Sequence, residues 1–219
     1  MTPKYRRIFN VVLLICFFSA VAQICILPTL PDTIPVHWNA AGEVDGYGSR
    51  WLGLLFAVLP MASVALMRLM SRIDPKRESY EKHMDVYVIF MILLAMLLII
   101  VGWVIVLAAE NIVVPMDRIV PGMLGAFFVV IGRYMPRIRH NYSFGIRTSW
   151  TLASETVWNK THRAGGICFI ISGIGMVLQA IFPSQLVVTL SMALLIGTVV
   201  FVTVYSWYCW QQEQKEQKK

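Results

Sequence analysis

Long stretches of apolar residues without a charged side chain constrain the fold of this chain more than any other feature. Apolar residues make up 58% of its 219 residues and charged residues only 14%, whereas a soluble domain is roughly half apolar and about a quarter charged. A helix of about 20 residues covers the roughly 30 Å of a bilayer's hydrocarbon core. The sequence therefore predicts an all-α integral membrane protein, a bundle of six transmembrane helices. We place the spans at residues 8–27, 51–70, 86–108, 119–132, 166–182 and 186–208.

The positive charges are distributed unequally between the connections, and this predicts the orientation. With the N-terminus inside the cell, 17 of the 19 lysines and arginines lie on the inner side, and only Arg50 and Arg118 lie outside. Inner loops of membrane proteins are enriched in lysine and arginine in this way. We therefore expect a multi-pass protein of the cell membrane with both termini in the cytoplasm. The net charge of +7 then reflects topology and contact with anionic lipid, and we expect no direct nucleic-acid binding.

Two connections are longer than a simple link requires, and they suggest two modules. The first module, residues 1–85, contains two spans and the extracellular loop 28–50. The second, residues 86–219, contains four spans and the cytoplasmic loop 133–165. The stretch from Ser71 to Asp85 between them has four basic and four acidic residues, a pattern typical of a solvated helical linker.

The outer loop gathers polar side chains among residues that favour turns. His37, Asn39, Glu43 and Asp45 lie within nine residues. Imidazole and carboxylate groups can bind metals, but the spacing matches no established ligand pattern, so we favour hydrogen bonds that shape the loop over an ion or ligand contact. Asp45-Gly46 is a common turn pair.

The inner loop predicts a short helix in the membrane interface. Thr151 is a suitable cap for a helix that begins near Leu152. One face of this helix would carry Trp150, Ser154, Val157, Trp158 and Thr161 toward the membrane, and Gly165-Gly166 would then turn the chain into the fifth span. Arg147 or Arg163 could form a bidentate ion pair with Glu155. An interfacial anchor alone would not need this density of arginine, threonine and carboxylate.

These loops carry the resemblance to a known family. The inner segment GIRTSWTLASETVWNKTHRAGG, residues 145–166, closely resembles the segment typical of SdpI family immunity proteins. The outer segment IPVHWNAAGEVDGYGSR, residues 34–50, is similar to the N-terminal IPxHxNxxGxxD module that often accompanies it. Two positions depart from the family pattern, since Ser149 stands where proline is usual and Arg133 where asparagine is usual.

The resemblance implies a membrane immunity protein that protects against a secreted membrane-active peptide toxin. It also implies a possible sensor that recruits a cytosolic helix-turn-helix autorepressor. The implied functional positions on the cytoplasmic side are Asn141, Gly145, Ile146, Arg147, Thr148, Trp150, Thr151, Glu155, Trp158 and Arg163. On the extracellular side they are Pro35, His37, Asn39, Gly42, Asp45 and Gly46.

Two other classes of function compete with this one, and the sequence leaves only the first of them as an alternative. A small-solute transporter or channel would need polar groups within its spans, and the sequence offers Ser19, Gln23, Gln179, Thr189, Ser191 and Thr198 but no acid or base near a span's centre. An enzyme is not expected, because the chain has no HExxH, GxSxG or Walker segment. His162, beside Arg163, is the nearest approach to an acid–base group. We expect no metal site and no cofactor.

Overall fold

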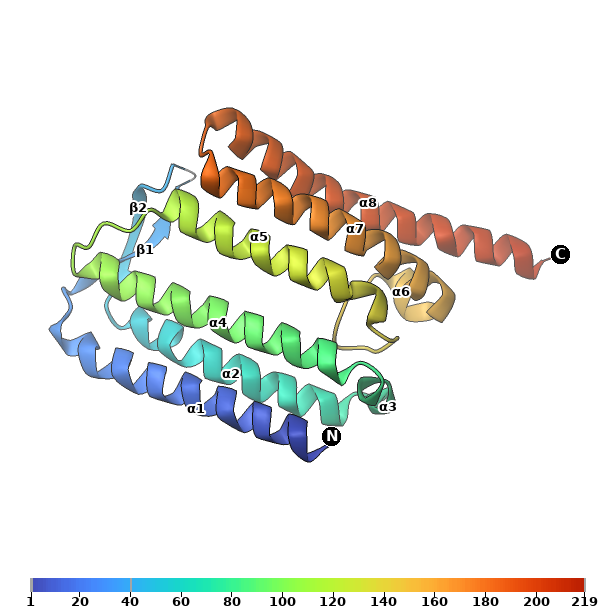
Figure 1. The fold of residues 1–219 in the computed structure, drawn as a ribbon, viewed down its shortest axis with the longest axis horizontal. Helices are drawn as coiled ribbons and strands as arrows, with labels where there is room; N and C mark the ends of the chain where they lie inside the picture. Colours follow the sequence, from blue (N-terminus) through green and yellow to red (C-terminus); the bar gives the residue numbers. More distant parts are fainter. Residues whose placement is uncertain (1, 40, 219) are drawn as a thin grey trace. The chain divides into compact units, whose positions relative to one another are not determined.

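The structure is a computed structural model that describes residues 2–39 and 41–218. Within these residues, six helices are long and apolar enough to cross a bilayer (Figure 1). This confirms the predicted all-α membrane protein with six helices. The six are α1 (Pro3–Ile26), α2 (Leu52–Ile73), α4 (Met84–Ala109), α5 (Met116–Tyr134), α7 (Glu155–Ile181) and α8 (Gln185–Gln217).

The chain forms two compact units whose boundaries fall inside helices. The first unit contains residues 1–70 and 87–120, and the second contains residues 71–86 and 121–219. Each unit thus combines segments from both modules suggested above. The division into modules 1–85 and 86–219 concerns the sequence and stays a prediction.

In the first unit, polar side chains join α1 to α2 and α4 within the apolar helices. Trp103 of α4 donates from its indole Nε1 to Ser19 Oγ of α1 at 3.0 Å, and the Gln23 amide donates to the same oxygen at 3.2 Å. Arg68 of α2 donates to the Asn10 side chain at 2.9 Å. Because polar groups in hydrocarbon must find partners within the protein, these bonds hold the three helices together.

The outer loop of the first unit folds into a β-hairpin of β1 (Thr33–Trp38) and β2 (Val44–Ser49). The 3-10 turn η1 (Leu27–Thr29) precedes it. Ile34 packs with Leu27, Leu30, Ile105 and Val106 in a small apolar core. The expected Asp45-Gly46 turn is wrong, since both residues lie within β2.

In the second unit, α5 and α7 approach each other at two glycine pairs. A Cβ atom built on Gly125 would lie 2.6 Å from the carbonyl oxygen of Gly173, and one on Gly132 would lie 2.6 Å from that of Gly166. Only glycine permits backbones to pack this closely, as small residues do at many helix contacts in membranes. The expected turn at Gly165-Gly166 is wrong, since both residues lie within α7, which runs unbroken from Glu155 to Ile181.

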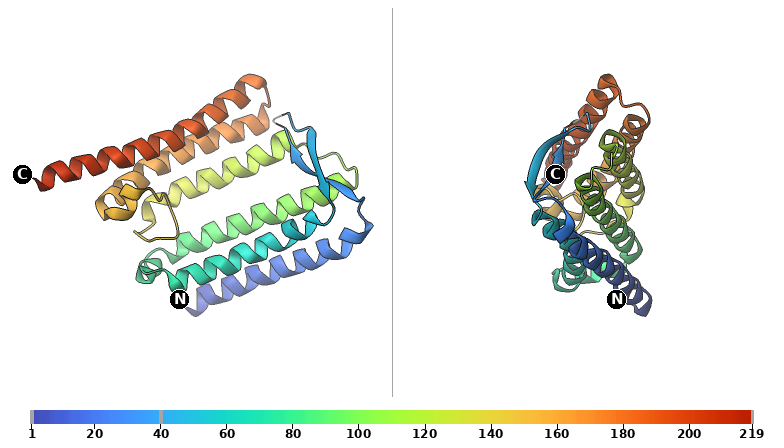
Figure 2. Two further views of the ribbon diagram at one scale, coloured as in Figure 1. Left: turned by 180° about the vertical axis from the view of Figure 1, so that it is seen from behind. Right: turned by 90° about the vertical axis from the view of Figure 1, so that its left-hand side faces the viewer.

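Helices α7 and α8 pack along each other as an antiparallel pair (Figures 1 and 2). Between them, Ser172 Oγ and Thr198 Oγ1 lie 2.8 Å apart, and Ser191 donates to the Gln179 side chain. The Ser184 side chain accepts from the backbone N–H of Val187 and caps α8. Of the polar residues noted in these spans, Gln179, Ser191 and Thr198 thus serve contacts between α7 and α8, whereas Thr189 donates to the Gln185 carbonyl of its own helix.

Short elements complete the second unit. These are α3 (Arg77–Glu81), the 3-10 turn η2 (Met135–Arg137) and α6 (Ser149–Ala153). The inner loop therefore has a short helix, but it differs from the expected one. Thr148 caps α6, Ser154 ends it and caps α7, and α7 then continues into the fifth span without a break.

Candidate functional site: a buried polar cluster beside the inner loop

The second unit contains a cluster of buried polar and aromatic side chains, which we call the inner cluster. Its members come from the segment before α4, from the loop after α5 and from the first turns of α7. They are Asp74, Tyr80, His83, His140, Asn141, Trp158 and His162, all less than 9% exposed.

Asp74 accepts the hydrogen bonds that join the segment before α4 to the loop after α5. Its carboxylate accepts from Ser143 Oγ at 2.7 Å, from Tyr80 Oη at 3.0 Å and from the Tyr142 backbone N–H at 3.1 Å, and its other oxygen accepts from the Lys76 N–H at 2.8 Å. Burial alone would raise the pKa of Asp74, but these hydrogen bonds outweigh it and hold the pKa below the ordinary value. The carboxylate is therefore charged and fixed.

Asn141 folds the loop that Asp74 binds. Its side-chain oxygen accepts from the backbone N–H groups of Ser143 and Phe144 at 2.9 and 2.6 Å. Its amide nitrogen donates to the carbonyls of Arg139 and Phe144 at 2.8 and 2.9 Å. An asparagine side chain commonly replaces backbone partners in a tight turn, and here it uses both ends to do so.

The next turn packs against α7 through Gly145. Its φ of +115° suits glycine, and a Cβ there would lie 2.4 Å from His162 Nε2. That nitrogen accepts from the Ile146 N–H at 3.0 Å. Trp158 stacks on the His162 ring at 4.0 Å between centroids and donates from its indole to the Ile138 carbonyl at 2.9 Å. The loop is thus clamped to one face of α7.

Two further histidines lie in the inner cluster, and both favour the neutral form. Burial lowers the pKa of His83 to about 4. Burial and the neighbouring Lys76 ammonium, whose Nζ lies 2.7 Å from His140 Nδ1, lower the pKa of His140. His83 stacks on Phe144 at 6.3 Å between centroids. These rings fill the space between the two loop segments.

The two threonines identified from the sequence form the start of α6. Thr148 Oγ1 accepts from the Thr151 N–H at 3.2 Å, and Thr151 Oγ1 accepts in return from the Thr148 N–H at 2.9 Å. This is a reciprocal capping box. Thr148 also donates to Ser206 of α8 at 3.0 Å, and Ser154 donates to Glu213 of α8 at 2.8 Å, so α6 is tied to α8 as well.

The structure separates the predicted inner residues into two groups. Asn141, Thr151 and Trp158 are fully buried, Gly145 packs against the inner cluster, and Thr148 and Trp150 are half-buried. Arg147, Glu155 and Arg163 are exposed. Arg147 donates to the Tyr142 carbonyl at 2.9 Å, and among the described residues neither arginine forms the ion pair with Glu155 expected above.

Two other expectations for this region are wrong. Trp158, Val157 and Thr161 face the protein interior rather than the membrane surface. The segment from Ser71 to Asp85 is no solvated linker, since it supplies Asp74, Tyr80 and His83 to the inner cluster. The sequence analysis missed these three residues because the charges of the segment are balanced. The signal that could have identified them is Asp74 directly before Pro75, with Tyr80 and His83 within the next nine residues.

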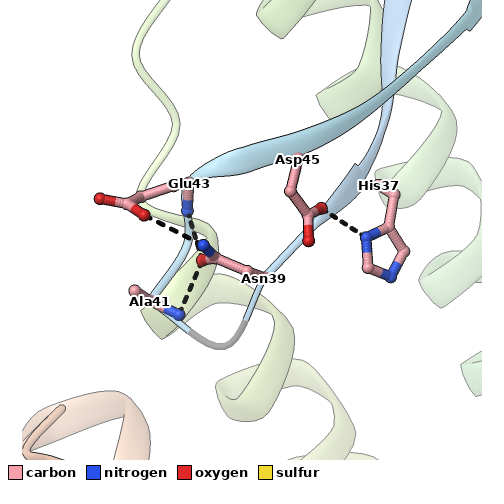
Figure 3. Close-up of polar contacts among 5 residues, drawn as sticks. All are labelled: His37, Asn39, Ala41, Glu43 and Asp45. Atoms are coloured by element: carbon pink, nitrogen blue, oxygen red, sulfur yellow. Dashed lines mark hydrogen bonds and ion pairs between the residues drawn. The ribbon is translucent and has the colours of Figure 1, made fainter.

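The outer residues form a second, smaller polar group on the hairpin (Figure 3). His37 Nδ1 lies 2.5 Å from Asp45 Oδ1 across the two strands. Asn39 accepts from the N–H groups of Ala41 and Glu43 and donates to the Glu43 carboxylate at 3.0 Å. These side chains bond to one another in the turn, and the described residues contain no group of three metal-ligating side chains.

Two glycines of the hairpin occupy positions that require glycine. Gly42 has a φ of +79°, and a Cβ on it would lie 2.9 Å from the Asp117 backbone nitrogen. Gly46 lies opposite His37, where a Cβ would be 2.8 Å from the histidine Cβ. Pro35 pairs with Tyr47 in the same ladder. The six outer residues thus lie together on one hairpin.

Taken together, the six apolar helices, the polar hairpin of the first unit and the inner cluster of the second unit define a multi-pass membrane protein with two structured loop groups. Residues 137–206 match the model of the SdpI/YfhL protein family. Residues 14–61 match a domain of unknown function, DUF1648. The chain is also 22% identical to the immunity protein SdpI of Bacillus subtilis (strain 168) over 206 residues, which cover 92% of this chain and 94% of that protein.

The chain is therefore similar to SdpI family proteins, and the match to the family model lies within residues 137–206. The family match begins at Arg137. It includes His140 and Asn141 of the inner cluster, α6, α7 and most of α8. No solved structure gives a significant match.

Proposed function

We propose that this chain is a membrane immunity protein that protects its cell from a secreted, membrane-active peptide toxin. The observation that carries the proposal is the similarity to the immunity protein SdpI over nearly the full length of both chains. The family match over residues 137–206, which contain the most elaborate hydrogen-bonded part of the molecule, supports it further.

The proposed orientation follows from the distribution of charge. With both termini in the cytoplasm, 17 of 19 lysines and arginines lie inside. The hairpin then faces the outside, where the toxin arrives, and the inner cluster faces the cytoplasm. In this arrangement the toxin meets the hairpin and the outer helix ends, and the inner loop serves any cytosolic partner.

The division between buried and exposed residues suggests separate roles on the inner side. Asn141, Thr151 and Trp158 shape the loop from within. Arg147 and Glu155 are exposed at its surface, where a partner can reach them, although Arg147 also donates to the Tyr142 carbonyl. We propose that this surface recruits a cytosolic helix-turn-helix autorepressor, so that the protein also acts as a sensor.

A small-solute transporter or channel is the alternative, and the paired polar groups of the spans weigh against it. Such a protein needs polar groups that face a pathway. Here Ser19 is bonded by Trp103, Ser172 lies against Thr198, and Gln179 accepts from Ser191. These polar groups bond to a neighbouring helix rather than face a pathway for a solute.

The test is survival of a toxin-sensitive Gram-positive host that expresses the chain and is challenged with spent medium from the source strain. The exposed variants Arg147→Ala and Glu155→Gln are compared with wild type at matched membrane levels. Arg133→Gln, an exposed change at the end of α5, is the control.

Wild type should restore growth, and the control should protect equally. If the inner surface serves signalling alone, both loop variants should also protect but fail to hold a tagged repressor at the membrane. The proposed immunity would be contradicted if host cells that express the wild-type chain died at a toxin dose that cells expressing the immunity protein SdpI survive. Solute uptake by purified protein in liposomes would then favour the transporter.

A further inference from the structure

A groove of about 590 Å³ opens between α7 and α8 in the second unit. Its walls carry Lys160, Arg163, Ala164 and Ile167 from α7, with Tyr205, Tyr208, Gln212 and Glu216 among the residues from α8. It is separate from the inner cluster, because Trp158 and His162 point into the protein and are fully buried.

The positive charges of the groove form no ion pair with another described residue. Lys160 and Arg163 are three residues apart on α7 and therefore share one face, and both are exposed. None of the ion pairs formed by residues 2–39 and 41–218 involves either side chain. The cations are thus available to an anion that enters the groove.

The groove changes from polar to apolar along its length. Since α7 and α8 are antiparallel, Lys160 lies at about the level of Tyr208, Gln212 and Glu216 lie beyond it toward the start of α7, and Ile167 lies nearer Tyr205. The Ser154–Glu213 and Ser172–Thr198 contacts fix this register. Ile167 begins the long apolar part of α7, and the residues of α8 before Tyr205 are mainly apolar. The transition therefore falls where a span leaves the hydrocarbon for the headgroup layer.

We propose that this groove binds an anionic glycerophospholipid, with its phosphate between Lys160 and Arg163 and an acyl chain along Ala164 and Ile167. Basic pockets between helices at the membrane boundary suit lipid headgroups of this kind. Arginine and lysine provide donors for phosphate oxygens. Gln212 and Glu216 accept hydrogen bonds from headgroup hydroxyls, which a phosphatidylglycerol headgroup supplies. The lipid occupies the site whether or not the chain confers immunity.

The test uses the full chain in nanodiscs that contain equal amounts of phosphatidylglycerol and phosphatidylcholine with matched acyl chains. Native mass spectrometry of the released protein counts the lipids that stay bound. The double variant Lys160→Gln/Arg163→Gln removes the charges, and Ala164→Phe fills the apolar floor. Arg133→Gln, an exposed cation at the end of α5, is the matched control. All variants are first matched for monodispersity and thermal unfolding in neutral detergent.

Wild type and the control should retain phosphatidylglycerol over phosphatidylcholine. The double variant should lose roughly 10- to 30-fold of that preference, as expected for two phosphate contacts at the membrane surface. Ala164→Phe should lose bound lipid with the charges still present. Equal retention by the double variant would overturn the proposal. Displacement of the lipid by millimolar inorganic phosphate would also overturn it, because the site would then recognise a free anion.

Discussion

Alanine at Gly125 tests the close contact between α5 and α7 within the second unit. The substituted Cβ would lie 2.6 Å from the Gly173 carbonyl oxygen, 2.8 Å from the Val177 backbone nitrogen and 2.9 Å from the Val177 side chain. Two of these three atoms belong to the backbone, so no side-chain rotation relieves the clash. To reach an ordinary contact of 3.4 Å, the helices must separate by roughly 0.8 Å at this point.

The size of the effect follows from two opposing contributions. Alanine favours a helix over glycine by about 1 kcal/mol. Forcing a methyl group into a packed contact costs about 1–3 kcal/mol and occasionally more. Because two of the clashing atoms are backbone, we take the upper part of this range, about 2–3 kcal/mol. After subtraction of the helix-propensity gain, Gly125→Ala should lower the free energy of unfolding by about 1–2 kcal/mol, which is about 2–8 °C in Tm for a chain of this size.

The chain supplies its own control at Gly197 of α8, where a built Cβ has no atom within 4 Å. Gly197→Ala should be neutral or stabilising by up to about 1 kcal/mol. The assay is thermal unfolding of the purified variants in one neutral detergent, followed by tryptophan fluorescence. The double variant Gly125→Ala/Gly173→Ala should cost less than the sum of the single changes, because the first has already separated the helices.

Equal Tm values for Gly125→Ala and wild type would refute the close helix contact. A drop of the same size in Gly197→Ala would refute it too, because the loss would then come from alanine in a span rather than from the α5–α7 approach.

Three further outcomes test the inner cluster. Asp74→Asn removes the charge that four donors share and should lower the free energy of unfolding by about 1.5–3 kcal/mol, measured by thermal unfolding. Stability should fall as the pH drops from about 6.5 to about 4, since His83 is neutral in the fold with a pKa near 4 and binds a proton more readily when unfolded. His83→Gln should reduce that slope, and an unchanged slope would contradict this assignment. Gly145→Ala should cost about 1–3 kcal/mol, because its φ of +115° and the His162 ring leave no place for a Cβ. Unaltered melting of this variant would mean that the loop is not clamped to α7.

The six spans could be predicted because each depends on a local property, the length of an apolar run. The boundaries were less certain where polar residues continue a helix. Span five was expected to begin at residue 166, but α7 begins at Glu155. Ser154 caps it there, and Trp158 and His162 bury their rings in the inner cluster, so tertiary contacts stabilise helix where hydropathy gives no signal.

The candidate site was only half visible in the sequence. Asn141, Gly145, Thr148 and Thr151 were named from the sequence, and the structure shows that they shape the inner loop, while their role in function stays a prediction. Asp74 was missed because its partners, Ser143 and Tyr142, are about 70 positions away in the sequence. Such a contact leaves no periodic pattern in a single chain.

The most direct test of the proposed immunity is the membrane potential of a sensitive host at the moment of exposure. Cells that express the chain and cells with an empty vector are loaded with a potential-sensitive dye and exposed to the same dose of the peptide toxin. If the chain confers immunity, the vector cells should depolarise rapidly and the expressing cells should retain their membrane potential. Equal depolarisation of both strains, with the chain present in the membrane at full level, would contradict the proposed immunity.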